Sequence, residues 1–246
     1  MTLLIGAQCK DGIVMGCDRK TLRGGEVEYS NKLFEFDLGG RVLFAAEGLT
    51  GIRDDFFLLL NHEISRRKGV DTLYEVKLIV EDIIADLTER YSERVEEESP
   101  LGVLMGGLER IREGKAKLYY IHGVGYGEQV SFRCTGHGGE YAYSLAKFLC
   151  DPHTASKYPV GAVARLIAFV ICWIAEDVDS TVGGPPQIGM LKDGNKEVGF
   201  LDEEAITGVS EHAKKAKGNL IEYFRLEHLL SQGQGQHRKN GRTTRR

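Results

Sequence analysis

The residue with the clearest chemical potential is Thr2, which is preceded only by the initiator methionine. A threonine at a free chain terminus carries both a hydroxyl nucleophile and a base, because its own α-amino group has an ordinary pKa of about 7.7–8.0 and is partly neutral near pH 7. Methionine before a small residue is routinely excised, so we expect Thr2 to become the terminus without a propeptide. The alternative is that Thr2 simply suits the start of a strand, and position alone favours that alternative.

The bulk composition is that of an ordinary globular protein. Of 246 residues, 42% are hydrophobic and 28% are charged, which is enough for one large α/β domain or two small ones. The formal net charge of -4 does not favour a nucleic-acid partner. The sequence has no apolar run of bilayer length and no basic region typical of a signal peptide. We therefore expect a cytoplasmic protein with no membrane partner.

Cysteine and histidine spacing gives no sign of a metal site. No CxxC pair occurs, and the five cysteines are scattered along the chain. The glycines of 123–127 lack the spacing and the following Lys-Ser/Thr of a phosphate loop, so they predict a turn between strands. We expect no metal, no cofactor and reduced thiols at the five cysteines: Cys9, Cys17, Cys134, Cys150 and Cys172.

Two strand pairs are predicted near the N-terminus. Residues 2–9 and 13–17 flank Lys10-Asp11-Gly12, and Asp-Gly between apolar runs is a strong hairpin signal. Residues 32–38 and 41–47 flank a Gly-Gly pair and predict a second strand pair.

Two helices should follow these strands. Apolar residues at helical spacing predict the first helix, which stops near 68–69: Ile52, Phe56, Leu60 and Ile64. The second should start at an Asp71-Thr72 cap, with Glu75 completing a capping box, and end in the acidic run 96–98.

The rest of the chain alternates strands and helices in groups. Further strands are predicted over 101–108, 116–122, 129–134, 187–192 and 197–201, with helices over 139–150, 160–178 and from Asp202. Grouped strands favour antiparallel sheets over a parallel sheet. The sequence therefore predicts an α+β fold, a four-layer αββα sandwich of two antiparallel sheets. We expect one domain over 1–230 and a disordered basic tail over 231–246, which solubilises the protein or contacts another subunit.

Five segments, taken in order, resemble proteasome β-type subunits, which are N-terminal nucleophile hydrolases. The first is the opening hairpin with its KDG turn, residues 2–19, and the second is NKLFEFD over 31–37. The others are AEGLTGIRD over 46–54, CTGHGG over 134–139 and DSTVGG over 179–184. The resemblance covers roughly residues 2–225 and extends to archaeal and bacterial proteasome-like homologues. The α-type subunit matches poorly, because its extra N-terminal helix has no counterpart here.

The resemblance implies a role for each of five residues. Thr2 would attack a peptide carbonyl and form an ester. Lys32 would lie beside it and oppose protonation of the amine, and Asp18 would hold Lys32 by a charge-assisted hydrogen bond. The Gly48 N–H would face the oxyanion, and Asp179 would support the α-amino side. The simpler interpretation of Asp18 and Lys32 is an ordinary ion pair at strand ends.

The resemblance also suggests supporting and pocket residues, with two departures. Ala46 and Thr50 would line the pocket for the side chain before the cleaved bond, and Thr21 would support the site. His137 stands where the family usually has a serine, and Val182 stands in place of a second serine. Valine can neither donate nor accept a hydrogen bond, whereas His137 could serve as a polar substitute or be a surface turn residue.

Three functions are compatible with these residues. The first is a threonine endopeptidase that degrades polypeptides in a self-compartmentalised homo-oligomeric ring, with α-type subunits or an ATP-dependent unfoldase as partners. The second is an N-terminal nucleophile amidase or transpeptidase of narrow specificity, which the two departures motivate. The third is a non-catalytic structural ring subunit.

Overall fold

The computed structural model describes residues 2–23, 25–38, 40–67, 69–91 and 101–223. The predicted tail over 231–246 lies outside these residues. So does the acidic run 96–98, where the second helix was expected to end. The described part of that helix ends at Tyr91.

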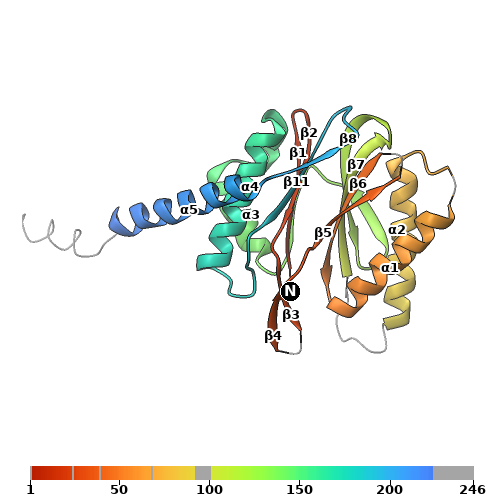
Figure 1. Ribbon diagram of the computed structural model, residues 1–246, viewed down its shortest axis with the longest axis horizontal. Helices are drawn as coiled ribbons and strands as arrows, with labels where there is room; N and C mark the ends of the chain where they lie inside the picture. Colours follow the sequence, from red (N-terminus) through yellow and green to blue (C-terminus); the bar gives the residue numbers. More distant parts are fainter. Residues whose placement is uncertain (1, 24, 39, 68, 92–100, 224–246) are drawn as a thin grey trace, which may run out of the picture.

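Two five-stranded sheets are present within the described residues. In spatial order, the first contains β10 (Phe132–Gly136), β1 (Leu3–Cys9), β2 (Gly12–Cys17), β11 (Gln187–Lys192) and β12 (Val198–Phe200). The second contains β5 (Leu33–Asp37), β6 (Arg41–Gly48), β7 (Leu101–Arg110), β8 (Glu113–His122) and β9 (Tyr126–Gln129). All neighbouring strands in both sheets are antiparallel. A separate hairpin, β3 (Lys20–Arg23) with β4 (Glu26–Tyr29), projects beside the N-terminus (Figure 1).

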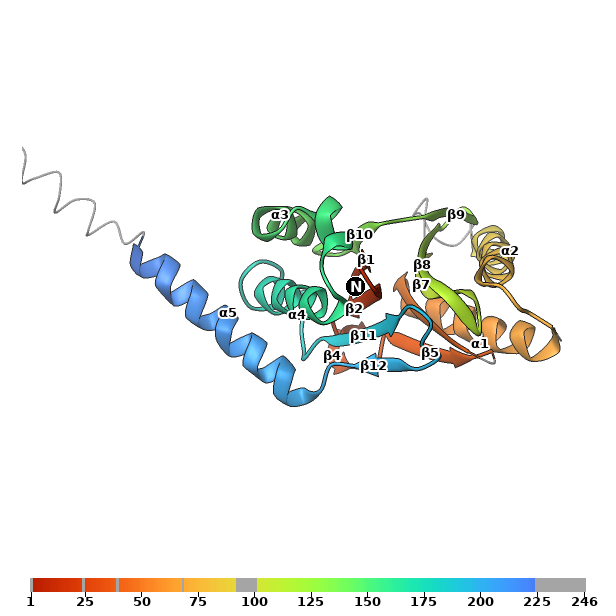
Figure 2. The ribbon, with the colours of Figure 1, turned by 90° about the horizontal axis from the view of Figure 1, so that it is seen from above.

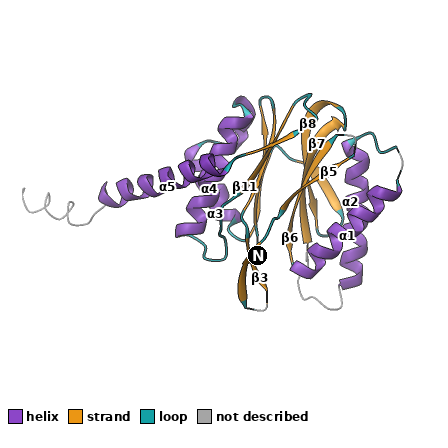
Figure 3. Cartoon of the chain, viewed as in Figure 1, coloured by secondary structure: helices purple, strands orange, loops and turns teal. Residues whose placement is uncertain are grey.

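Helices cover the outer face of each sheet (Figure 3). The second sheet is covered by α1 (Thr50–Arg66) and α2 (Leu73–Tyr91), and the first by α3 (Gly139–Leu149) and α4 (Val160–Asp177). A short 3-10 helix, η1 (Pro152–Lys157), connects α3 to α4. The last helix, α5 (Glu203–Tyr223), packs against α4 and then leads away from the sandwich (Figure 2). The predicted four-layer αββα sandwich is therefore confirmed.

Alternation of side chains along the strands explains the layers. In β6, Phe44 belongs to the core beneath α1 and α2, whereas Leu43 and Ala45 belong to the core between the sheets. In β1, Leu3 faces α4 and Leu4 faces the opposite sheet. Successive side chains of a strand point to opposite faces, so each strand contributes to two apolar layers. The continuous apolar runs in these strands follow from burial on both sides.

The start of α2 shows why the local sequence specifies its position. The Thr72 N–H donates to Glu75 Oε2 at 2.9 Å, and the Glu75 N–H donates to Thr72 Oγ1 at 3.2 Å. This reciprocal arrangement is the predicted capping box, and it satisfies two N–H groups at the helix start.

Two regions differ from the sequence prediction. The strand predicted over 129–134 is wrong, because β9 and β10 divide this region and belong to different sheets. The turn predicted over 123–127 is shorter than expected, since β9 already begins at Tyr126. The β3–β4 hairpin was not predicted, because each strand has only four residues and β4 is exposed throughout.

Candidate active site

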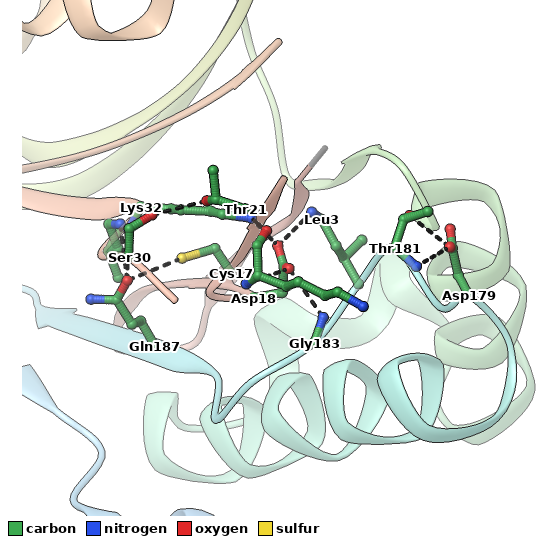
Figure 4. Close-up of polar contacts among 12 residues, drawn as sticks. Leu3, Cys17, Asp18, Thr21, Ser30, Lys32, Asp179, Thr181, Gly183 and Gln187 are labelled. Atoms are coloured by element: carbon green, nitrogen blue, oxygen red, sulfur yellow. Dashed lines mark hydrogen bonds and ion pairs between the residues drawn. The ribbon is translucent and has the colours of Figure 1, made fainter. Parts of the chain in front are cut away.

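Three buried residues meet at the end of the sandwich where the N-terminus lies. Thr2 directly precedes β1, Asp18 directly follows β2, and Lys32 directly precedes β5. Antiparallel pairing of β1 with β2 places the start of the first beside the end of the second. Thr2 is 2% exposed, and Asp18 and Lys32 are 0% exposed. Figure 4 shows Asp18 and Lys32 together with Leu3, the residue after Thr2.

Asp18 is an organising acceptor at this junction. Its Oδ1 accepts from the Leu3 N–H at 2.9 Å and from Lys32 Nζ at 2.9 Å. Its Oδ2 accepts from the N–H groups of Lys20 at 3.1 Å and Gly183 at 3.2 Å. A buried carboxylate needs such donors to offset the cost of its desolvation. The arrangement fixes the backbone next to Thr2 relative to three other segments.

The Lys32 ammonium is buried in the same place. It pairs with Asp18 and donates to the carbonyl oxygen of Lys20. Burial lowers the pKa of Lys32 from its ordinary range, and the pairing with Asp18 offsets part of that effect. A buried ammonium in this position would favour charge developing on a neighbouring oxygen.

Gln187, at the start of β11, anchors the Lys32 backbone and was not predicted from the sequence. Its Oε1 accepts from the N–H groups of Lys32 at 2.7 Å and Leu33 at 3.4 Å, and from Cys17 Sγ at 3.8 Å. Gln187 is 8% exposed. A buried amide at the start of an otherwise apolar strand is the signal that could have identified it.

Two glycines, Gly48 and Gly136, end strands at this junction in backbone conformations that favour glycine. Gly48 ends β6 with φ of 117°, a backbone conformation that favours glycine. Gly136 ends β10 with φ of 79°, and a Cβ there would lie 2.0 Å from the carbonyl oxygen of Thr2. The strand beside Thr2 therefore approaches so closely that only glycine fits.

Asp179 lies on the far side of Leu3 and Gly183 from the Asp18–Lys32 pair (Figure 4). Its Oδ1 accepts from the Thr181 N–H at 2.8 Å and from Thr181 Oγ1 at 2.6 Å. Burial raises the pKa of Asp179, but the two hydrogen bonds from Thr181 outweigh that effect and the pKa is lowered. Asp179 Oδ2 lies 3.6 Å from the position of a Cβ on Gly138, so the carboxylate faces the turn after β10.

The two departures from the family pattern, His137 in that turn and Val182 in the loop packed against it, have different environments. His137 is exposed. Val182 is 1% exposed and belongs to the core beneath α4. Its Cγ2 lies 3.2 Å from the position of a Cβ on Gly138, so an apolar side chain packs directly under the turn.

The remaining predicted site residues are Ala46, Thr50 and Thr21. Ala46 is 0% exposed and packs in the core beneath α1 and α2, so its methyl group is not accessible. Thr50 is the first residue of α1 and is partly exposed. Thr21 is buried in β3, where its Oγ1 lies 2.9 Å from Ser30 Oγ.

Other features of the described residues concern metals, membranes and cavities. No group of three or more His, Cys, Asp and Glu side chains in these segments is arranged to hold a metal ion. Among the helices described, none combines the length and apolar character that crossing a bilayer requires. A cavity of about 630 Å³ lies between α4, α5 and the loop 180–186, and Lys20 and Tyr29 also line it.

Comparison with known proteins places this geometry in a family. The family model described as Proteasome subunit matches residues 2–167. No curated protein matches the chain.

Several solved structures share the fold. A Gly-1 mutant of Anbu from Hyphomicrobium sp. strain MC1 has a TM-score of 0.73 at 16% identity, over 90% of this chain and 97% of that chain. Anbu from Yersinia bercovieri, described as an ancestral beta-subunit, has a TM-score of 0.73 at 13% identity, over 91% and 97%. Anbu from Pseudomonas aeruginosa, solved as a helical assembly, has a TM-score of 0.73 at 18% identity, over 90% and 96%. At these identities the structures show a common fold.

The match to the family model covers the chain from Thr2 into α4, so it concerns the sequence as well as the fold. It includes Asp18 and Lys32, the two residues that form the buried pair beside the start of β1. The chain therefore belongs to the proteasome subunit family.

Proposed function

We propose that the chain is a threonine endopeptidase in which Thr2, exposed by removal of Met1, is both nucleophile and base. The observation that carries this proposal is the fully buried Asp18–Lys32 pair, whose carboxylate also accepts from the Leu3 N–H. Burying two charges at strand ends is expensive, and a hydrophobic pair would serve stability as well. Because Asp18 and Lys32 lie next to Thr2, whose hydroxyl would stand at the chain terminus, the pair has a role in the reaction.

In this proposal each residue contributes one function to the reaction. Thr2 Oγ attacks the carbonyl carbon of a peptide while its proton passes to the α-amino group. The Gly48 N–H donates to the oxyanion of the tetrahedral intermediate, and the Lys32 ammonium stabilises negative charge near the hydroxyl. The protonated amino group then gives its proton to the leaving amine, which produces an ester. Water, deprotonated by the same amino group, hydrolyses that ester and restores Thr2.

Asp179 and the turn after β10 would complete the α-amino side of the site. The carboxylate of Asp179 is held in place by Thr181 and faces the turn. Thr50 would contribute to the pocket for the side chain before the cleaved bond, and Thr21 would support the site. We further propose that copies of the chain assemble in the cytoplasm into a ring or a helical array that receives unfolded polypeptide from an ATP-dependent unfoldase. The helical assembly of the Pseudomonas aeruginosa protein supports an oligomer.

A second function, acyl transfer to an amine instead of water, is favoured by one observation. The turn after β10 has an exposed His137 and rests on the apolar Val182. A hydroxyl at these positions would orient the attacking water, and its loss costs about 1–3 kcal/mol of positioning. Adding a small amine nucleophile during peptide turnover and measuring ligated against hydrolysed product separates the two functions.

Peptide turnover by substituted proteins tests the proposal. Thr2→Ala should lower kcat by at least about 1,000-fold, because it removes the nucleophile, and Thr2→Ser should retain measurable turnover. Thr88→Ala is the matched control, because Thr88 Oγ1 also makes a hydrogen bond, to the Gly123 carbonyl oxygen. Thr88 lies on α2, on the outer side of the second sheet. Undiminished turnover in Thr2→Ala would overturn the proposal.

A further inference from the structure

Glu47, the residue before Gly48, presents a carboxylate to the space between the sheets. Leu43 and Ala45 of the same strand belong to the core between the sheets, and Glu47 continues their alternation. It is partly exposed, so it lies at the margin of that core. The apolar core between the sheets is therefore bordered by an acidic side chain, which lies next to Gly48, the glycine proposed to bind the oxyanion.

The carboxylate joins three strands from two sheets. Thr135 Oγ1 of β10 donates to Glu47 Oε1 at 2.5 Å, and the Tyr120 hydroxyl of β8 donates to the same oxygen at 2.8 Å. Thr135 Oγ1 also lies 3.3 Å from the Tyr120 hydroxyl. Glu47 and Tyr120 belong to the second sheet and Thr135 to the first, so the bonds of Thr135 cross the interior of the sandwich, whereas the Tyr120–Glu47 bond lies within the second sheet.

The same carboxylate lies close to Gly136, whose Cα also lies close to the backbone of the proposed nucleophile. A Cβ on Gly136 would lie 2.0 Å from the Thr2 carbonyl oxygen and 2.6 Å from Glu47 Oε2. Leu3 pairs with Gly136, and Leu4 pairs with Thr135. Strand β10 therefore both donates a hydrogen bond to Glu47 and pairs with β1, the strand that follows Thr2.

The surrounding residues are shaped to accept this contact. A Cβ on Gly102 would lie 2.7 Å from Glu47 Oε1 and 2.6 Å from the Tyr120 hydroxyl, so β7 leaves room for both groups. Tyr120 is 5% exposed, and its ring lies 4.2 Å from the Arg133 guanidinium. Burial, together with the charge of Glu47, raises the pKa of Tyr120, which keeps its hydroxyl protonated as a donor.

We propose that Glu47 is a positioning residue, a carboxylate bridge that sets the distance between Thr2 on one sheet and Gly48 on the other. Thr2 lies at the start of β1, and Gly48 lies at the end of β6. No strand connects the two by hydrogen bonds, because they belong to different sheets. The Glu47–Thr135 bond links the strand that ends at Gly48 to the strand that pairs with β1. The catalytic consequence rests on the proposed function, whereas the bridge itself does not.

Two substitutions distinguish the hydrogen bonds that Glu47 accepts from its negative charge. Glu47→Ala removes both acceptor oxygens, whereas Glu47→Gln keeps one amide oxygen that can accept from Thr135 and Tyr120. Glu81→Ala is the matched control. Glu81 is a carboxylate that ties α2 to β9 by accepting from the Gly127 N–H at 2.6 Å, far from Thr2. All three proteins, as full chains, are compared with the unsubstituted protein.

The first measurement is peptide turnover and acylation of Thr2 by a β-lactone. Displacement of reacting groups by about 1 Å costs up to about 100-fold in rate. Glu47→Ala should therefore lose about 10- to 100-fold in kcat and in the acylation rate, with KM changed by less than about 3-fold. Glu47→Gln should recover most of that loss, and Glu81→Ala should keep the original rate. An unchanged rate in Glu47→Ala, or no recovery in Glu47→Gln, would overturn the positioning role.

The second measurement is amide hydrogen exchange, which needs no activity. Glu47→Ala should speed exchange in peptides covering 44–50 and 132–138, whereas Glu81→Ala should affect only the segments around 125–129 and 77–81. Unchanged exchange in Glu47→Ala would overturn the bridge. If the unsubstituted protein does not react with the β-lactone, the proposed function fails, and exchange still decides whether the bridge exists.

Discussion

Replacing Asp18 with asparagine should destabilise the protein in a pH-dependent way. The carboxylate accepts four hydrogen bonds, two on each oxygen, from Leu3, Lys20, Gly183 and the Lys32 ammonium. An asparagine has one acceptor oxygen and adds an NH2 group that must face donors. The substitution therefore removes the charge partner of a buried ammonium and leaves backbone N–H groups without an acceptor.

The size of the effect follows from burial. Both partners of the pair are 0% exposed, so solvent does not screen their interaction. Removing one partner of a buried pair costs about 3–5 kcal/mol in the free energy of unfolding, since it leaves an uncompensated charge. For a chain of this size that loss lowers the melting temperature by roughly 10 °C.

The pH dependence follows from Lys32. Burial lowers its pKa below the ordinary 10.5, so between the lowered value and 10.5 the unfolded chain binds a proton that the folded chain does not. Stability from this group is present at high pH and is lost as pH falls through that window. Asp18 opposes the lowering, so Asp18→Asn lowers the pKa of Lys32 further and extends the window downward. The substitution should cost less at pH 9.5 than at pH 7.

Guanidinium unfolding at both pH values measures these differences. Glu113→Gln is the control, because Glu113 pairs with Arg110 at 3.1 Å with both side chains more than 60% exposed. A surface pair of this kind contributes about 0–1 kcal/mol. The reasoning is refuted if Asp18→Asn costs no more than the control at pH 7, or if its cost is the same at both pH values.

Three further predictions concern the surroundings of the site. Gly136→Ala should lower the free energy of unfolding by about 2–4 kcal/mol, because its Cβ would overlap the Thr2 carbonyl oxygen. The control Gly161→Ala, which has open space around it, should be neutral or stabilising in the same guanidinium denaturation assay. Gln187→Ala should cost about 1–3 kcal/mol in that assay by removing the acceptor of a buried N–H, and a loss below 0.5 kcal/mol (about the scatter for surface changes) would contradict it. Burial raises the pKa of Cys17 to about 12, so iodoacetamide at pH 8 should alkylate it only after unfolding, as peptide mass mapping would show.

The sandwich could be predicted because its strands are long and apolar and its helices have a clear period. The capping box at Thr72 and Glu75 also placed the start of α2 closely. Alternation in a short strand does not say which sheet the strand joins. For that reason the division of 129–134 between β9 and β10 was missed. The exposed β4 has only four residues, too few for their alternation to indicate a strand, so its hairpin was missed too.

The candidate site was predictable where its residues stand at strand ends within recognisable segments. Asp18 and Lys32 meet because β2 ends, and β5 begins, at the same edge of the sandwich. Gln187 was missed because its partner Lys32 is 155 residues away in the sequence. Glu47 was missed for the same reason, since Thr135 lies 88 residues further along the chain. A single polar residue inside a strand does not reveal a partner at such a separation.

In the proposed reaction, one terminal residue supplies both the hydroxyl and the amine. Intact-mass and peptide mass measurement after treatment with a β-lactone tests this double role. We expect a protein without Met1 that gains one lactone mass on Thr2, and no gain in Thr2→Ala. A protein that retains Met1, or that carries the adduct on any other residue, would contradict it.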